Sequence, residues 1–86
     1  MRKVDRATAL RSKAVLVKWC RIKDEPNWRL VSIEVQTRTD DWETESKPEA
    51  TVERMTEKGM RERIESIGQR YSIDAYSIEE VSSLAA

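Results

Sequence analysis

The stretch AVLVKWCRIKDEPNWRLVSIEVQTRT, residues 14–39, decides the fold because two β-rich runs flank a short polar segment. In residues 14–20 every side chain except Lys18 is apolar, a pattern typical of a strand covered on both faces of its sheet. Residues 24–27, Asp-Glu-Pro-Asn, provide the side chains and the fixed proline φ that favour a reversal of the chain. The sequence therefore predicts a β-hairpin over residues 14–39.

The second run of the hairpin, residues 28–39, has the period of a strand with one buried face, because Val31, Ile33 and Val35 alternate with polar residues. Two registers are compatible with this pattern. One pairs Val15, Val17 and Trp19 with Val35, Ile33 and Val31, and the other pairs Leu16 and Cys20 with Val35 and Val31. A shift of one residue exchanges the two faces of a strand, and the sequence leaves both registers open.

Residues 40–49 are polar and acidic, and we expect a loop there that leads into a helix over residues 50–70. Ser46 and Glu49 have the spacing of a capping box, and Pro48 is compatible with a first helical turn. Later in this segment, spacings of four, three and four define one apolar stripe, made of Met60, Ile64, Ile67 and Tyr71. Val52 and Met55 are out of phase with the stripe, so we expect a kink or a helix boundary near Gly59.

The two ends of the chain carry weaker patterns. Residues 71–76 alternate and predict a short third strand, and Ser77 with Glu80 has capping-box spacing that predicts a short helix over residues 78–84. Residues 1–13 are basic and predict either a mobile arm or a short helix. The expected fold is a small single-domain α+β protein, with a mainly antiparallel three-stranded sheet, one long helix across one face and a short C-terminal helix.

The composition excludes several classes of function. The 86 residues contain no histidine, which removes the usual general base and the commonest transition-metal ligand. Cys20 is the single cysteine, so an intramolecular disulfide is excluded, and its place in an apolar strand predicts a buried core residue. We therefore predict a protein that is not an enzyme and needs no metal or cofactor. No apolar run matches a membrane span or a signal peptide, which predicts a cytoplasmic location.

Charge is unevenly distributed along a chain whose formal net charge is zero. Residues 1–23 carry eight basic and one acidic side chain, whereas residues 24–50 carry three basic and eight acidic ones. Such a dipolar molecule can orient against a charged partner or against its own copy.

The acidic middle of the chain contains a large apolar residue, Trp42, with carboxylates on both sides. Its side chain either folds back over a sheet edge or forms an exposed anchor for a partner with a basic surface. The predicted partner-binding residues are Asp40, Asp41, Trp42, Glu43 and Glu45. A Ca²⁺ or Mg²⁺ site is the alternative for the carboxylates, but EF-hand spacing is missing, so a solvated acidic loop is the simpler interpretation.

These observations favour a non-catalytic protein-binding module, a small inhibitor or regulator that docks on a larger protein. The alternative is a nucleic-acid-binding regulator that uses the basic N-terminal third, with its phosphate contacts made by Arg2, Lys3, Arg6, Arg11 and Lys13. Trp19 or Trp28 would then stack on a base. A free sheet edge also makes a homodimer an option. Small domains of this kind lead us to expect an origin in a phage or mobile element.

Overall fold

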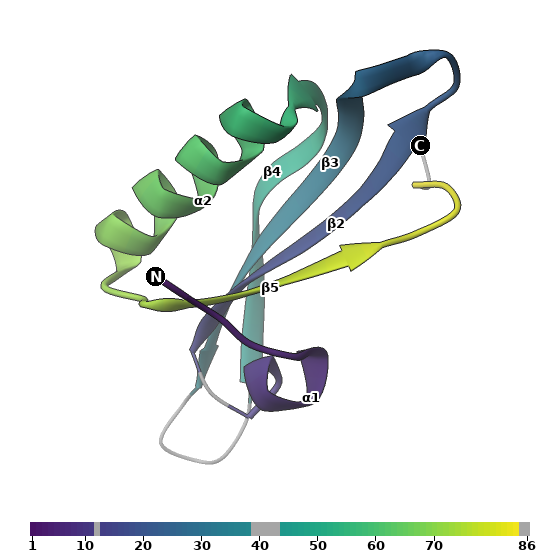
Figure 1. The fold of residues 1–86 in the computed structure, drawn as a ribbon. Coiled ribbons are helices and arrows are strands. Elements are labelled where there is room, and N and C mark those ends of the chain that lie inside the picture. Colours follow the sequence, from purple (N-terminus) through teal and green to yellow (C-terminus); the bar gives the residue numbers. More distant parts are fainter. Residues whose placement is uncertain (12, 39–43, 85–86) are drawn as a thin grey trace.

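The computed structural model describes residues 1–11, 13–38 and 44–84, and shows an α+β fold built on a five-stranded sheet (Figure 1). A long helix lies across one face of the sheet, and a short helix lies at one end of the other face. The elements in chain order are β1 (Arg2–Lys3), α1 (Arg6–Ala9), β2 (Ala14–Ile22), β3 (Glu25–Arg38), β4 (Thr44–Thr56), α2 (Glu57–Tyr71) and β5 (Ala75–Glu80).

The strand order in the sheet is β1-β5-β2-β3-β4. Strands β2, β3 and β4 form an antiparallel meander, and β5 lies parallel to β2 on the opposite side from β3. Helix α2 makes the crossover that a parallel connection requires. The expected α+β class is confirmed, but the sheet has five strands of mixed direction rather than three that are mainly antiparallel.

The predicted hairpin is formed by β2 and β3, in the first of the two registers. Val15 lies opposite Val35, and Val17 lies opposite Ile33. The reversal is tighter than the sequence predicted, because β3 already begins at Glu25, and Asp24 adopts a positive φ of 64°. Asparagine and aspartate tolerate this left-handed conformation better than most residues do.

The core lies between α2 and the face of the sheet that this register selects. It comprises Val15, Val17, Val31, Ile33, Val35, Met60, Ile64, Ile67 and Ile73. The predicted stripe on α2 is therefore confirmed for Met60, Ile64 and Ile67, all of which are buried. Cys20 is a free thiol with 5% of its surface exposed, in agreement with the predicted structural role.

The prediction that the long helix begins near residue 50 was wrong. Residues 44–56 form β4 instead, because an extended conformation lets them satisfy the backbone groups along the outer side of β3. The helix begins at Glu57, and its N-cap is Thr56, whose hydroxyl accepts a hydrogen bond of 3.1 Å from the Gly59 amide. The phase change before Gly59 thus marks a helix boundary, and not a kink.

The C-terminal predictions were also wrong, since the strand expected over residues 71–76 lies at residues 75–80, and residues 78–80 are strand where a short helix was expected over 78–84. Strand β5 pairs with residues 15–19 of the long central strand β2, and its residues Ala75 and Ser77 are buried. At the other end of the chain, Arg2 and Lys3 pair with β5 in parallel before α1 begins. None of the helices in the described part of the chain is long and apolar enough to cross a membrane.

Candidate functional site

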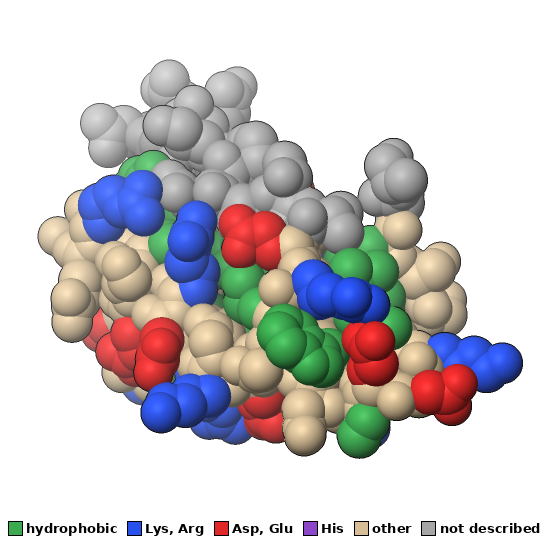
Figure 2. Space-filling model, turned by 90° about the horizontal axis from the view of Figure 1, so that it is seen from above, with side chains coloured by type: hydrophobic (Ala, Val, Ile, Leu, Met, Phe, Trp, Pro, Cys, Tyr) green, Lys and Arg blue, Asp and Glu red, His purple; other side chains and the backbone are tan. Residues whose placement is uncertain are grey.

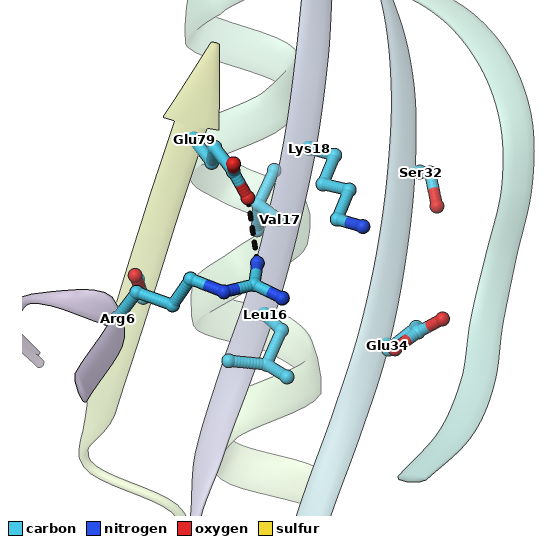
Figure 3. A pocket seen from close by; sticks show the side chains of 8 residues that line it. Arg6, Leu16, Val17, Lys18, Ser32, Glu34 and Glu79 are labelled. Atoms are coloured by element: carbon cyan, nitrogen blue, oxygen red, sulfur yellow. Dashed lines mark hydrogen bonds and ion pairs between the residues drawn. The ribbon is translucent and has the colours of Figure 1, made fainter. Parts of the chain in front are cut away.

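The face of the sheet opposite α2 carries side chains from three different strands that surround a shallow hollow (Figure 3). We call it the open face, and define it by six residues of β2, β3 and β5, namely Leu16, Lys18, Ser32, Glu34, Ser77 and Glu79. Alternation along each strand directs these side chains away from the core, where their neighbours Val17 and Ile33 are buried. Helix α1 covers one end of this face, where Gln36 Nε2 donates a 2.8 Å hydrogen bond to the carbonyl oxygen of Ala9.

The open face is shallow. Its residues and Arg6 surround a hollow of about 50 Å³, which accommodates only a few water molecules. Pockets for small molecules or cofactors typically enclose about 300 to 1,000 Å³. The hollow on the open face is thus several times smaller than a typical small-molecule pocket.

Charges of both signs alternate across the open face. The Arg6 guanidinium reaches over Leu16 and its Nη1 lies 2.6 Å from Glu79 Oε2, with both side chains about half exposed (Figure 3). Lys18 and Glu34 are exposed on the adjacent strands. An exposed ion pair of this kind contributes at most about 1 kcal/mol to stability. Its main effect is to fix opposite charges at defined positions on the surface.

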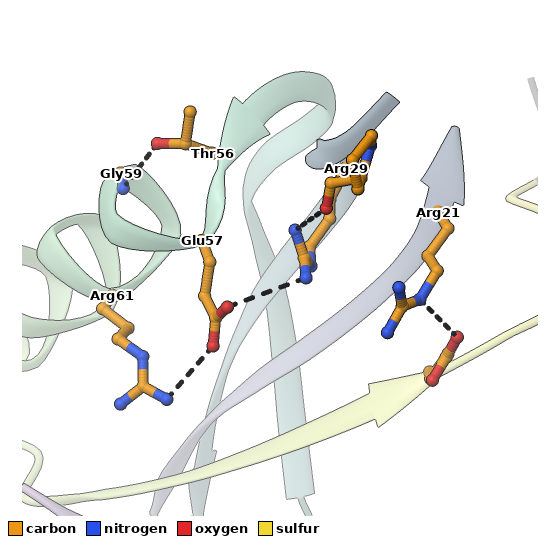
Figure 4. Close-up of polar contacts among 8 residues, drawn as sticks. Arg21, Arg29, Thr56, Glu57, Gly59 and Arg61 are labelled. Atoms are coloured by element: carbon orange, nitrogen blue, oxygen red, sulfur yellow. Dashed lines mark hydrogen bonds and ion pairs between the residues drawn. The ribbon is translucent and has the colours of Figure 1, made fainter. Parts of the chain in front are cut away.

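A second polar cluster connects the hairpin to the first turn of α2 (Figure 4). Arg29 is only 7% exposed, and its Nη2 lies 3.7 Å from Glu57 Oε2, while Nη1 donates a long 3.4 Å hydrogen bond to the Pro26 carbonyl. Its guanidinium also lies over the ring of Trp19, at 4.7 Å from the centroid. Arg29 thus occupies the Trp19 ring with a contact made within the protein.

The predicted partner-binding residues fall largely beyond the described structure. Asp40, Asp41, Trp42 and Glu43 lie outside the described residues, in the connection between β3 and β4. Glu45 lies in β4, with its backbone opposite Thr37. This set of residues stays a prediction.

The basic residues of the alternative site lie on three successive segments of the chain. Arg2 and Lys3 lie on β1 at one edge of the sheet, Arg6 lies in α1, and Arg11 and Lys13 lie on the connection to β2. Acidic side chains lie among them, because Glu79 pairs with Arg6 and Asp5 caps α1. Figure 2 shows the same mixture on another side of the molecule, where blue and red side chains alternate without a patch of one sign.

Asp5 is the ionisable group whose environment is most clearly defined. Its Oδ1 accepts a 2.7 Å hydrogen bond from the Thr8 amide, which makes Asp5 the N-cap of α1. The hydrogen bonds from Thr8 hold the pKa of the Asp5 carboxyl below its ordinary value of 3.8, and the positive charge of Arg11 adds to this effect. The capping hydrogen bonds stabilise the ionised carboxylate, and a lowered pKa does not prepare Asp5 for acid-base chemistry at neutral pH.

The described residues contain no group of three or more histidine, cysteine or acidic side chains that could hold a metal ion. Comparisons of the chain with protein-family models, with curated proteins and with solved structures found no match. Because a fold alone does not determine a function, the geometry of the surface is the basis for a functional proposal.

Proposed function

We propose that the chain is a non-catalytic protein-binding module, a small inhibitor or regulator that docks on a larger protein through the open face. The observation that carries the proposal is the position of partly buried Leu16, which has the exposed Glu34 directly opposite on β3 and the exposed Lys18 next to it on the same face of β2. Protein interfaces are usually organised in this way, with apolar surface at the centre and polar groups at the border.

The alternating charges also favour a protein partner over a nucleic acid. A nucleic-acid site needs several cations that neutralise successive phosphates, and carboxylates among them repel the same backbone. Glu34 and Glu79 lie within the open face, and Glu79 already forms an ion pair with Arg6. A partner with both acidic and basic side chains can complement such a surface, which gives specificity more than affinity.

The predicted acidic segment extends this proposal. The β3–β4 connection and the start of β4 contain Asp40, Asp41, Trp42, Glu43 and Glu45, and they follow directly on β3, one of the strands of the open face. We propose that they steer the approach of a basic region of the partner, with Trp42 as an anchor.

The test is affinity capture with charge-reversed variants. Tagged wild-type protein would be incubated with nuclease-treated extract of its native host, in parallel with Lys18→Glu and Glu34→Lys. We expect a protein bound by the wild type to be depleted at least about tenfold with either variant, because a like charge at an interface costs more than 1 kcal/mol.

Lys58→Glu is the matched control, since Lys58 is exposed on α2, on the other side of the sheet. This variant should retain the partner. Equal capture by all four proteins would contradict docking through the open face. If binding is seen in untreated extract and is absent from nuclease-treated extract, the result would favour the nucleic-acid alternative.

A further inference from the structure

The outer edge of β5 is only half paired. Strand β1 covers its first part, where the Arg2 amide donates to the Asp74 carbonyl at 2.6 Å and the Val4 amide donates to the Tyr76 carbonyl at 2.8 Å. The register of β1 on β5 ends at Tyr76, and the chain then turns away into α1. The remaining residues of β5, Ser77–Glu80, have β2 on one side and no described strand on the other.

The direction of the backbone groups on this edge follows from two hydrogen bonds. The Tyr76 carbonyl points outward to β1, whereas the Val81 amide points inward and donates to the Trp19 carbonyl at 2.8 Å. Amide and carbonyl groups alternate in direction from one residue to the next along a strand. The amides and carbonyls of Ile78 and Glu80 therefore point outward, where the structure shows no strand to pair with them.

Room for another segment exists beside this edge. An open groove of about 500 Å³ lies between β5 and the chain that leaves β1, compared with about 50 Å³ for the hollow on the open face. Its walls are formed by Lys3, Val4, Asp5, Arg6, Ile78 and Glu79. The groove therefore continues the path of β1 along the unpaired half of β5.

We propose that the Ile78–Glu80 edge binds an extended segment of a partner protein, which adds a strand next to β5 beyond the end of β1. This inference rests on the proposed function, because it assigns a second contact to the same protein partner. Unpaired edges accept extended peptides through main-chain hydrogen bonds, while alternate side chains provide the selectivity.

The side chains of β5 define the pattern of the partner segment. Ile78 is partly buried against the core on the α2 side, so an apolar side chain beside it would extend the core. Glu80 follows on the same side, and its ion pair with Arg21 is long and exposed, at 3.8 Å. A basic side chain beside Glu80 would gain a second ion pair. The intervening residue of the partner would face the Arg6–Glu79 pair and should be polar.

A second copy of this chain fits the edge poorly. Antiparallel pairing of two identical edges would bring residues 78–80 of both copies together, and two of these three residues are glutamate. Like charges on directly opposed strands are destabilising. The edge thus favours a foreign segment with basic residues.

The test uses a defined probe, an equimolar pair of capped peptides, acetyl-Val-Thr-Lys-amide and acetyl-Lys-Thr-Val-amide, whose three residues would lie beside Ile78, Glu79 and Glu80 in the parallel and in the antiparallel direction. The pair would be titrated into the ¹⁵N-labelled full chain to about 10 mM of each peptide, a concentration that saturates a site with a dissociation constant of about 1 mM. We expect saturable shifts of the Ile78 and Glu80 amide signals. The same peptides with N-methylated amides cannot pair, and should produce no saturable shift.

Glu80→Pro is the decisive variant. The Glu80 amide points away from β2, so proline there removes an outward donor without breaking a bond to β2. We expect Glu80→Pro to weaken peptide binding at least about tenfold, while Glu80→Ala keeps the backbone donor and loses only the ion pair. The thermal midpoint of Glu80→Pro checks that the fold is retained.

Two results would overturn the inference. One is a lack of saturable shifts in the wild type, and the other is equal binding by the wild type and Glu80→Pro. If the variant fails to fold, the N-methylated peptides still decide the question. A partner that is lost with Lys18→Glu but retained with Glu80→Pro would overturn the edge site alone and leave the proposed function standing.

Discussion

The guanidinium of Arg29 lies 4.7 Å from the centre of the Trp19 ring, diagonally across β2 and β3. Because Arg29 is almost completely buried, the cation and the ring interact in a poorly hydrated environment, where such a pair contributes about 2 kcal/mol. Arg29 also faces Glu57, so the pair links the hairpin to the start of α2.

We predict that Arg29→Lys lowers the free energy of unfolding by about 1–2 kcal/mol, because lysine keeps the charge but loses the planar group that stacks on Trp19. Urea unfolding would measure the change. Arg21→Lys is the control, since the Arg21 guanidinium lies 5.8 Å from the same ring and its side chain is 63% exposed. This control should change stability by less than about 0.5 kcal/mol. Similar losses in both variants would contradict a special role for Arg29.

Gly68→Ala should destabilise the protein although alanine is the better helix former. A Cβ at position 68 would lie 2.8 Å from the Ile73 carbonyl oxygen and would collide with the Met1 side chain. We expect a loss of about 1–3 kcal/mol, typical of overpacking. At Gly59 the nearest atom is the Thr56 hydroxyl at 3.3 Å, so Gly59→Ala should stay within about 1 kcal/mol of the wild type. A stabilising Gly68→Ala would show that this contact is not close.

Thr56→Ala should cost about 1 kcal/mol of stability, because its hydroxyl caps α2 through the Gly59 amide. Ser46→Ala is a matched test, since Ser46 has capping-box spacing in the sequence but lies in β4 in the structure. It should leave the helix N-terminus unchanged. Amide hydrogen exchange at residues 57–60 would measure fraying directly. Faster exchange there in Ser46→Ala would contradict the observed helix boundary.

The cap of α1 should be lost in acid. The folded Asp5 carboxyl has a pKa below 3.8, so the unfolded chain binds this proton more readily than the folded one. The contribution of the cap is complete above pH 3.8 and disappears as the pH falls through the lower folded value. The Thr8 amide shift, followed from about pH 6 to pH 2, should titrate in the wild type. In Asp5→Asn it should not titrate, because asparagine caps without ionising.

Local patterns predicted the hairpin, its apolar faces and the stripe on α2. Each of these depends on periodicity within one element, as with Ile64 and Ile67, which recur on one side of a helix and are both buried. The out-of-phase Met55 likewise marked the start of the helix, which begins at Glu57, to within a few residues. Such signals are strong because one buried face repeats along one segment.

The errors arose where long-range pairing decides the structure. Ser46 and Ser77 both begin capping-box sequences, yet β4 and β5 are strands because β3 and β2 offer them backbone partners. No pattern within one segment indicates whether a distant strand will pair with it. The open face was missed for the same reason, since the Arg6–Glu79 pair joins residues 73 positions apart and depends on the parallel placement of β5.

The parallel pairing of β1 with β5 sets an order of assembly. Arg2 and Lys3 bond to a strand that begins at Ala75, so β1 has no partner in the sheet until that strand has been synthesised. The pairing of β1 therefore requires that β5 has been synthesised. A deletion that removes β5 would consequently leave β1 and the outer side of β2 without a pairing partner at once.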